Sequence, residues 1–271
     1  MLPLHTTNIH ITIPKMGCWF YFLMLTITTA VASPIKNQIH LLRPHSGSAG
    51  HKHSDINCLS WRLAVETDNL QDWTLVPQAC KDYVGHYMLG KQYRDDCDFV
   101  AAEAYKYAKG LNFTKDGKDI WIFDIDETTL SNIPYYALES VAFGSIPYNA
   151  TSFDQWTAKA VAPAIPGSLK LYKQLIKLGF KIVFLTGTRE KFKEPRIKNL
   201  KAVGYTQWEK LILKGDNDHG NGVEYKSSKR KELVEGGYRI RGNMGDQWSD
   251  LLGSNPGDRT FKVPDPMYYI A

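Results

Sequence analysis

From residue 118 onward, short apolar segments alternate with longer segments of helical pattern. The apolar segments, which predict strands, are 118–124, 181–185, 211–213 and 238–244. The segments between them, which predict helices, are 167–178, 189–203 (with a start delayed by Pro195) and 227–235. Strands that alternate with helices predict a parallel sheet with right-handed crossovers. The fold class that we expect is therefore α/β, a Rossmann-like parallel sheet flanked by helices.

Two stretches depart from this alternation. Residues 57–109 carry apolar side chains at spacings of three and four, which predicts a helical N-terminal region. Residues 130–165 separate the first strand from its helix, and we expect them to form a small cap insertion. We therefore expect one domain over 57–271 that contains the sheet, the N-terminal helices and the cap.

The N-terminus has the pattern of a targeting segment. Lys15 precedes an apolar run over 17–29, which ends in the small residues Ala30-Val31-Ala32. A positive flank, a short apolar stretch and an A-x-A site predict a signal peptide over 1–32, whereas a membrane anchor needs about 20 apolar residues. Residues 33–56 are rich in His, Ser, Gly and Pro, which favours a flexible leader over a metal-binding tract. We expect the mature chain to have no stable association with a membrane.

Removal of the signal peptide leaves three cysteines, Cys58, Cys80 and Cys97. In an oxidising compartment this number favours one disulfide and one free thiol. Because Cys97 lies within a helical pattern, we expect Cys58 to pair with Cys80. The sequons at Asn112 and Asn149 are typical of a glycoprotein of the secretory pathway, although such triplets also occur by chance.

Acidic residues directly follow the first predicted strand. In the segment Asp124-Ile125-Asp126-Glu127-Thr128, alternation places Asp124 and Asp126 on the same side of the extended chain. Two carboxylates there can divide the work of a displacement at phosphorus. One attacks, while the other protonates the leaving group and then deprotonates a water. Alone, such a pair is more typical of a solvated turn, so its interpretation depends on the other strand ends.

The other predicted strands also end in polar groups. Thr186-Gly187 follows the second strand and offers a hydroxyl and backbone amides for phosphoryl oxygens. Asp246 and Asp250 follow the fourth strand, and Lys226 opens the third helix, from where it can balance charge at the same edge. Because ligands of parallel sheets bind at the carboxyl ends of the strands, these groups predict a single site.

In this order, the motifs D-x-D-E-T, T-G-T-R, the lysine and G-D-x-x-x-D resemble the haloacid dehalogenase (HAD) superfamily of phosphohydrolases. More closely, residues 57–271 look like the plant acid phosphatase and vegetative storage protein family, related to the bacterial class B and C acid phosphatases. The resemblance implies a HAD-like fold and a set of site residues: catalytic Asp124, Asp126, Thr186 and Lys226; substrate-binding Thr186, Gly187 and Lys226; metal-binding Asp124, Asp126, Asp246 and Asp250.

The resemblance also implies a role for each residue. Asp124 is the expected nucleophile and Asp126 the expected acid/base. Lys226, rather than Lys214 or Lys229, is the expected charge-balancing lysine.

Charge then predicts a metal ion at the site. Asp124, Asp246 and a substrate dianion cannot crowd together without a cation, and a hard divalent ion with oxygen ligands meets that need. Mg²⁺ in contact with Asp124, the Asp126 carbonyl, Asp246 and the phosphate fits this requirement. Asp250 is expected to support the metal site.

The expected function is that of a secreted or vacuolar Mg²⁺-dependent acid phosphatase. It would hydrolyse small phosphomonoesters through a phospho-aspartyl intermediate. The alternative is a vegetative storage protein with weak or residual activity, because some members of the family have lost the nucleophile. Dehalogenase or phosphonatase chemistry matches the motifs less well. The sequence leaves open extracellular (cell wall) or vacuolar location within the secretory pathway, and a homodimer remains an open alternative because family members are often dimeric.

The charge balance predicts no nucleic-acid partner. A net charge of +5, from 33 Lys and Arg against 28 Asp and Glu, is mild and spread along the chain. One predicted helix is rich in basic residues, which we interpret as a solvated helix face: Lys191, Lys193, Arg196, Lys198 and Lys201. Four tryptophans are interpreted as packing residues: Trp121, Trp156, Trp208 and Trp248.

Overall fold

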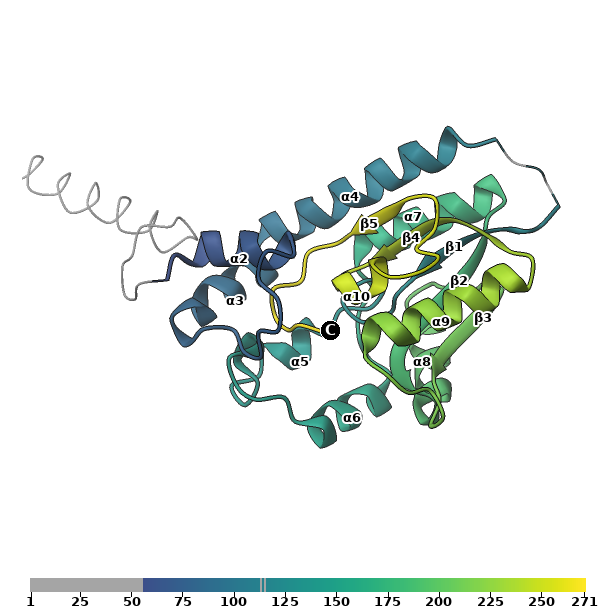
Figure 1. Ribbon diagram of the computed structural model, residues 1–271. Coiled ribbons are helices and arrows are strands. Elements are labelled where there is room, and N and C mark those ends of the chain that lie inside the picture. Colours follow the sequence, from purple (N-terminus) through teal and green to yellow (C-terminus); the bar gives the residue numbers. More distant parts are fainter. Residues whose placement is uncertain (1–55, 113, 115) are drawn as a thin grey trace, which may run out of the picture. The chain divides into compact units, whose positions relative to one another are not determined.

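The computed structural model describes residues 56–112, 114 and 116–271. The predicted signal peptide and, up to residue 55, the predicted leader lie outside these described residues. The centre of the fold is a sheet of five parallel strands in the order β3-β2-β1-β4-β5 (Figure 1). The strands are β1 (Asp119–Phe123), β2 (Lys181–Arg189), β3 (Lys210–Lys214), β4 (Arg239–Gly245) and β5 (Thr260–Lys262). The α/β fold class expected from the sequence is confirmed.

Helices cover both faces of the sheet, and the central strand shows why. All five residues of β1 are buried, with Trp121 and Phe123 in the larger core and Ile120 and Ile122 in the smaller one. The larger core contains apolar residues of α4 (Lys91–Lys109), α7 (Pro166–Leu178) and α8 (Lys193–Ala202). The smaller core contains those of α9 (Gly222–Glu235). Alternate side chains of a strand point to opposite faces, so a strand with apolar side chains on both sides needs cover on both faces.

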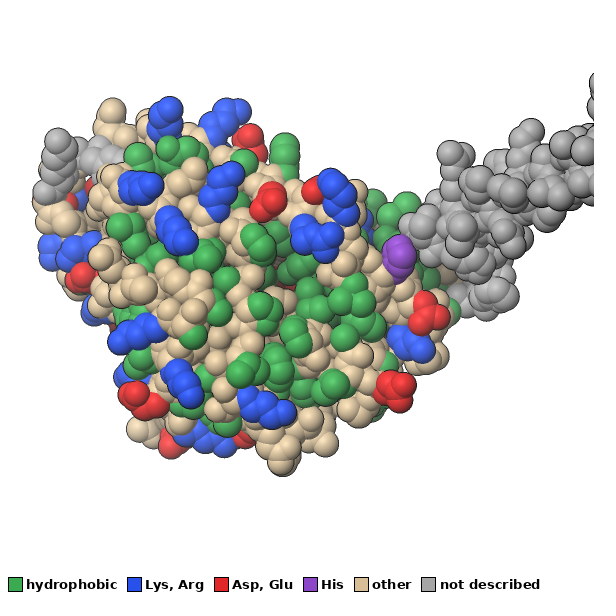
Figure 2. All heavy atoms as spheres, turned by 180° about the vertical axis from the view of Figure 1, so that it is seen from behind, with side chains coloured by type: hydrophobic (Ala, Val, Ile, Leu, Met, Phe, Trp, Pro, Cys, Tyr) green, Lys and Arg blue, Asp and Glu red, His purple; other side chains and the backbone are tan. Residues whose placement is uncertain are grey.

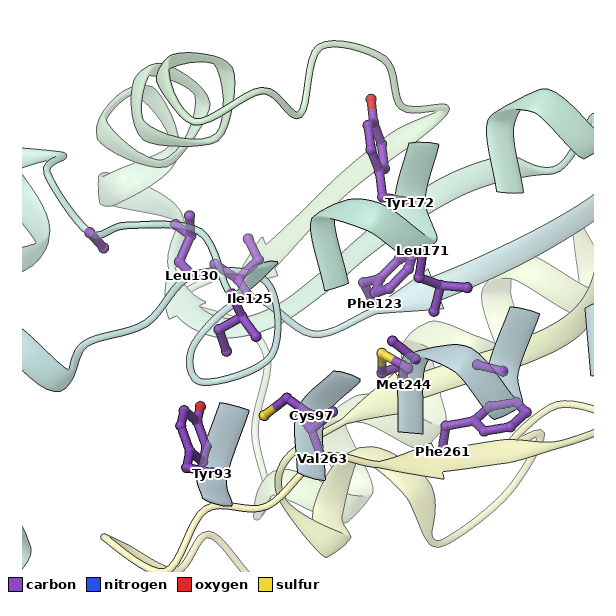
Figure 3. Close-up of a cluster of buried hydrophobic side chains, with 14 of the residues drawn as sticks. Tyr93, Cys97, Phe123, Ile125, Leu130, Leu171, Tyr172, Met244, Phe261 and Val263 are labelled. Atoms are coloured by element: carbon purple, nitrogen blue, oxygen red, sulfur yellow. The ribbon is translucent and has the colours of Figure 1, made fainter. Parts of the chain in front are cut away.

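Figure 3 shows how the larger core joins the elements. Phe123 of β1 lies beside Leu171 of α7, and Met244 of β4 and Phe261 of β5 continue the same layer. The sulfur of Cys97, from α4, lies in this cluster too. Side chains of distant segments thereby fix the sheet against its helices.

Local signals in the sequence explain where the helices begin and end. Pro166 starts α7 and Gly179 ends it with a left-handed φ of 98°. Helix α9 begins at Gly222, where Asn221 and Glu224 form a capping box. The predicted start at residue 227 is therefore five residues late, and Lys226 lies inside the helix. The short β5 and the one-turn helix α10 (Trp248–Leu251) were not predicted.

The N-terminal region is helical in separate pieces. It contains α2 (Cys58–Glu66), the 3-10 helix η1 (Gln78–Cys80), α3 (Lys81–Leu89) and α4. The expectation of helix over 57–109 is wrong between residues 67 and 77, where a loop separates α2 from η1. A disulfide joins Cys58 to Cys80 and closes this loop, and Cys97 is a buried free thiol. Both cysteine assignments made from the sequence are confirmed.

Residues 130–165 lie between β1 and α7 and have their own short helices. These are α5 (Ile133–Tyr136), η2 (Ala142–Gly144) and α6 (Ala150–Lys159), and a further 3-10 helix, η3 (Glu190–Phe192), follows β2. The two ends of the stretch are paired, because Leu130 forms an antiparallel bridge with Ala164 and the Ser131 amide donates to Pro163. The paired ends separate this stretch from the alternating strands and helices.

The surface of the described part has mixed character. On the face seen in Figure 2, Lys and Arg side chains are spread among apolar, acidic and neutral groups and do not gather in one patch. No helix between residues 56 and 271, outside the two undescribed positions, is long and apolar enough to cross a bilayer.

Candidate active site

Three neighbouring strands bring polar side chains to one edge of the sheet. Asp124 follows β1, Thr186 lies near the end of β2, and Asp246 follows β4. The Asp124 amide donates to the carbonyl of Met244 at 2.9 Å, which continues the ladder between β1 and β4 one step further. All three side chains are buried. The sheet therefore places residues that are up to 122 positions apart (246 − 124) at the same level.

Lys226 reaches this edge from α9. Its ammonium group contacts the Asp124 carboxylate, lies 2.7 Å from Asp250 Oδ1 and donates to the carbonyl of Leu185 at 2.6 Å. The lysine is only 5% exposed. Neither Lys214 nor Lys229 has this position, since Lys214 donates to Gly220 and Lys229 pairs with Asp218.

The crowding of acids changes their protonation. Burial raises the pKa of Asp124 well above its ordinary range, and Asp250 raises it further while Lys226 lowers it. Burial and the charge of Asp250 raise the pKa of Asp246 to about 7. Burial alone would lower the pKa of Lys226, but attraction to Asp124 and Asp250 outweighs this and raises it. The acids thus favour any additional positive charge that enters the site.

Polar neighbours fix the Asp246 carboxylate from two sides. The hydroxyl of Thr128 donates to Oδ1 at 2.9 Å, and the side-chain amide of Gln247 donates to Oδ2 at 2.8 Å. Gln247 also caps α10, because its backbone amide donates to Asp250 Oδ2 at 3.1 Å. One turn of chain therefore orients both acids of the G-D-x-x-x-D motif.

Asp126 lies apart from the other acids. Its carboxylate accepts hydrogen bonds from Arg196 at 2.5 Å, from Asn132 at 2.8 Å and from the hydroxyl of Thr188 at 2.9 Å. Arg196 is 1% exposed, so its interpretation as part of a solvated helix face is wrong. On α8 it shares the buried side with Asn199 and Leu200, three and four residues further on, and this spacing was the available signal.

Two further residues that support the site were not recognised in the sequence. The guanidinium of Arg230 is buried and donates to the carbonyls of Asp250 and Ser254 at 2.6 and 3.1 Å, which fixes the turn after β4. Gly245 leaves room for Asp250, because a Cβ atom there would lie 2.7 Å from the Asp250 Cγ. Arg230 stands in a run of basic residues and has no distinguishing signal there.

A cavity of about 690 Å³ opens above these groups. Asp124, Asp126, Thr186, Gly187, Lys226, Asp246 and Asp250 all line it, so every residue predicted for the site faces one cavity. Its other walls include aromatic side chains from distant segments: Trp73, Tyr136, Tyr148, Phe153, Tyr225, Tyr268 and Tyr269. Trp73 belongs to the loop closed by the disulfide and contacts the ring of Tyr269, with 6.3 Å between the centroids.

Three of the carboxylates have the arrangement of a cation site. Asp124, Asp246 and Asp250 each offer one oxygen, and these oxygens lie within 4.8 Å of one another. All three residues are buried, and the raised pKa values show that negative charge is in excess there. A set of carboxylate oxygens suits a hard divalent metal. The residues present therefore fit a metal ion.

A parallel sheet with acids and a threonine at the ends of its central strands, and a lysine that reaches them from a helix, defines an α/β enzyme of the HAD type. Residues 45–271 match the family described as HAD superfamily, subfamily IIIB (acid phosphatase). Acid phosphatase 1 of Solanum lycopersicum is 45% identical over 254 residues, which cover 93% of this chain and 98% of that protein. Vegetative storage protein 2 of Arabidopsis thaliana is 44% identical over 216 residues, 79% of this chain and 80% of that protein.

Solved structures agree with this assignment. The class C acid phosphatase from Bacillus anthracis is 26% identical, with a TM-score of 0.57 over 70% of this chain and 85% of that one. The chain therefore belongs to the acid phosphatase subfamily IIIB of the HAD superfamily. It is a phosphoric monoester hydrolase, and phosphatases of this superfamily use a divalent metal.

Proposed function

We propose that the chain is a secreted or vacuolar Mg²⁺-dependent acid phosphatase that hydrolyses small phosphomonoesters through a phospho-aspartyl intermediate. The observation that carries this proposal is the position of Lys226, whose ammonium contacts both Asp124 and Asp250 beside the buried Asp246. This arrangement supplies a nucleophilic carboxylate and positive charge at one point of the cavity.

In the proposed reaction, an oxygen of Asp124 attacks phosphorus and the bond to the leaving oxygen breaks. Asp126 gives a proton to that oxygen and later takes one from the water that hydrolyses the acyl phosphate. Lys226, Thr186 and the Gly187 amide bind the phosphoryl oxygens, on which negative charge is concentrated. The positions of these five residues around one cavity support the assignment.

Mg²⁺ is the ion that we propose for the acidic cluster. Asp124 and Asp246 would hold it together with the Asp126 carbonyl, and Asp250 would support the set. When bound, the ion would neutralise the charge that otherwise repels a phosphate dianion. The burial of these carboxylates and their oxygen-only chemistry support a hard cation.

The storage protein remains the second candidate, because relatives at 44% identity are named vegetative storage proteins. A relative of similar identity in Glycine max is named stem 28 kDa glycoprotein, which supports the secretory pathway and glycosylation at Asn112 or Asn149. In this chain Asp124 is present and paired with Lys226. That favours catalysis over storage alone.

Turnover of an aryl phosphate tests the proposal directly. We expect activity that a chelator removes and Mg²⁺ restores, and we expect Asp124→Asn to lower kcat by at least about 10³-fold, because no carboxylate remains to attack. Circular dichroism and unfolding in urea show whether the variant keeps its fold. A folded Asp124→Asn variant with full activity would exclude the nucleophile assignment, and a wild-type protein without turnover would favour storage.

A further inference from the structure

The Asp126 carboxylate accepts hydrogen bonds from Arg196, Asn132 and Thr188, which take no part in the proposed reaction. Oδ1 accepts from Arg196 Nη2 at 2.5 Å and from Asn132 Nδ2 at 2.8 Å, and Oδ2 accepts from the Thr188 hydroxyl at 2.9 Å. Arg196 Nη2 also donates to Thr188 at 3.1 Å, which closes the network. Both oxygens of Asp126 are therefore fixed, although the side chain itself lines the cavity and is 18% exposed.

The ion pair with Asp126 explains why Arg196 is buried. Its Nε has no hydrogen-bond partner within the described part of the chain, and its Nη2 serves Asp126 and Thr188. A buried guanidinium is strongly destabilising unless it is paired. The ion pair with Asp126 is thus the interaction that accounts for a cation at this place in α8.

Asn132, near the start of the inserted stretch, connects Asp126 to α6. Its Nδ2 donates to Asp126 and, at 2.8 Å, to Glu127 Oε2. Its Oδ1 accepts from the indole N–H of Trp156, on α6, at 2.8 Å. The indole fixes which end of the amide faces the two acids, because the reversed amide would point its oxygen at both carboxylates and leave the indole without an acceptor. Trp156, interpreted from the sequence as a packing residue, is therefore also a hydrogen-bond donor in this network.

We propose that Arg196, Asn132 and Trp156 are positioning residues that hold the Asp126 carboxylate toward the leaving oxygen of the substrate. This inference rests on the acid/base role proposed for Asp126. Proton transfer depends steeply on the orientation of the donor. Loss of the network should therefore slow protonation of the leaving oxygen by Asp126 more than it slows attack by Asp124. The stretch 130–165 thus contributes to leaving-group protonation through the Asn132 amide and the Trp156 indole N–H that orients it.

The dependence on the leaving group separates this role from a structural one. A nitrophenolate leaves without a proton, whereas an alkoxide such as that of glycerol needs one. We compare kcat/KM for nitrophenyl phosphate and glycerol phosphate, because this constant reports the step in which the leaving group departs. We expect Arg196→Met to lower kcat/KM for glycerol phosphate at least about 10-fold more than kcat/KM for nitrophenyl phosphate. For Trp156→Phe we expect this difference to be about 3-fold. Both values lie within the range of acid–base and hydrogen-bond effects.

Matched variants complete the design. Arg196→Lys restores part of the kcat/KM lost on the alkyl ester, because it returns a cation and the arginine Nε has no hydrogen-bond partner among the described residues. Trp208→Phe makes the same chemical change as Trp156→Phe at a residue that packs on Phe184, and it should affect both esters equally. If Arg196→Met does not fold, the Trp156→Phe comparison remains decisive, since the smaller ring keeps the stacking on Tyr135.

Asp126→Asn distinguishes the two ways in which the inference can fail. If this variant loses activity equally on both esters, the acid/base role is wrong and the inference falls with it. If Asp126→Asn is selective for the alkyl ester but Trp156→Phe and Arg196→Met are not, the acid/base role stands and the positioning role is overturned. Selectivity in all three supports both.

Discussion

A single lysine controls the charge at the centre of the site. Lys226 is buried between Asp124 and Asp250, and two carboxylates this close repel each other strongly where water is excluded. The ammonium turns this repulsion into two attractive contacts. Because its pKa is raised by Asp124 and Asp250, the lysine keeps its charge at neutral pH. It therefore counts as a permanent positive charge in the cavity.

Lys226→Met should remove this charge with little change of volume. We expect kcat on an aryl phosphate to fall by at least about 10²-fold, and the free energy of unfolding to fall by about 3–5 kcal/mol, as for other broken buried ion pairs. Turnover and urea unfolding measure the two effects. Lys229→Met, three residues along α9, loses only the ion pairs with Asp218 and Glu232 at the surface and should keep its activity. Equal activity of the two variants would contradict the assignment.

At the scale of residues, the sequence predicts which residues carry the chemistry better than it predicts which residues are buried. Asp124, Asp246 and Lys226 are recognisable because each follows or opens a predicted element and belongs to a motif. Arg196 is not, because a basic residue in a basic helix looks solvated until its partner is known. That partner, Asp126, lies 70 positions earlier in the chain. The spacing to Asn199 and Leu200 could indicate that Arg196 is buried, but no local pattern identifies so distant a partner.

At the scale of elements, the turn after β4 decides whether the last two acids meet the first. Gly245 ends the strand, Asp246 follows, and the four-residue helix α10 returns Asp250 toward the strand end. The turn is tight enough that Asp250 occupies the space of the missing Gly245 side chain. Arg230 then binds the carbonyls on the far side of the turn. The spacing G-D-x-x-x-D is therefore a packing requirement as well as a set of ligands.

Gly245→Ala tests this requirement. The added methyl group overlaps the Asp250 side chain, so we expect a loss of about 1–3 kcal/mol in stability and a fall in kcat that exceeds what the stability change explains. Thermal unfolding and turnover give the two numbers. Gly110→Ala is the matched control, because its nearest neighbour, the Tyr107 carbonyl oxygen, would lie at an ordinary 3.5 Å. Wild-type activity in Gly245→Ala would show that Asp250 need not lie here.

The observed bounds of the helices and strands differ from the predicted ones where the local sequence pattern is weak or short. Helix α9 starts five residues before its predicted start, since a capping box at Asn221 precedes a first turn that looks like a polar loop. Strand β5 has three residues and pairs only with β4, so its pattern is too short to detect. The segments β1, α7 and the first five residues of β2 are readily predicted because their apolar pattern continues over several turns or pleats, whereas the last four residues of β2 were not predicted as strand.

At the scale of the whole molecule, ionisation of Asp246 opposes folding when no metal ion is bound. Asp246 ionises near pH 7 in the folded protein without metal but near its ordinary pKa of 3.8 when unfolded. Between these values the folded state binds more protons than the unfolded state, so stability falls as the pH rises through this interval. Above about pH 7 both states have lost this proton, and its contribution to stability is gone.

The metal-free enzyme should therefore be more stable at pH 5 than at pH 8. In EDTA we expect Tm to be lower at pH 8 by about 5 °C, which is about 2 kcal/mol for a domain of this size. Mg²⁺ should raise Tm more at pH 8, because the ion binds ionised carboxylates. Asp246→Asn in EDTA should show a smaller pH dependence. A metal-free protein that gains stability from pH 5 to pH 8 would contradict the raised pKa of this cluster.

The loop that the Cys58–Cys80 bond closes lies outside the sheet and yet forms one wall of the cavity through Trp73. The residues proposed to cleave the ester lie at the strand ends and on α9, whereas the shape of the cavity depends in part on this tethered loop. The wall formed by this loop and the residues proposed to cleave the ester thus come from separate stretches of chain. Variation between relatives within residues 58–80 can change which esters are preferred while every residue proposed to cleave them stays the same.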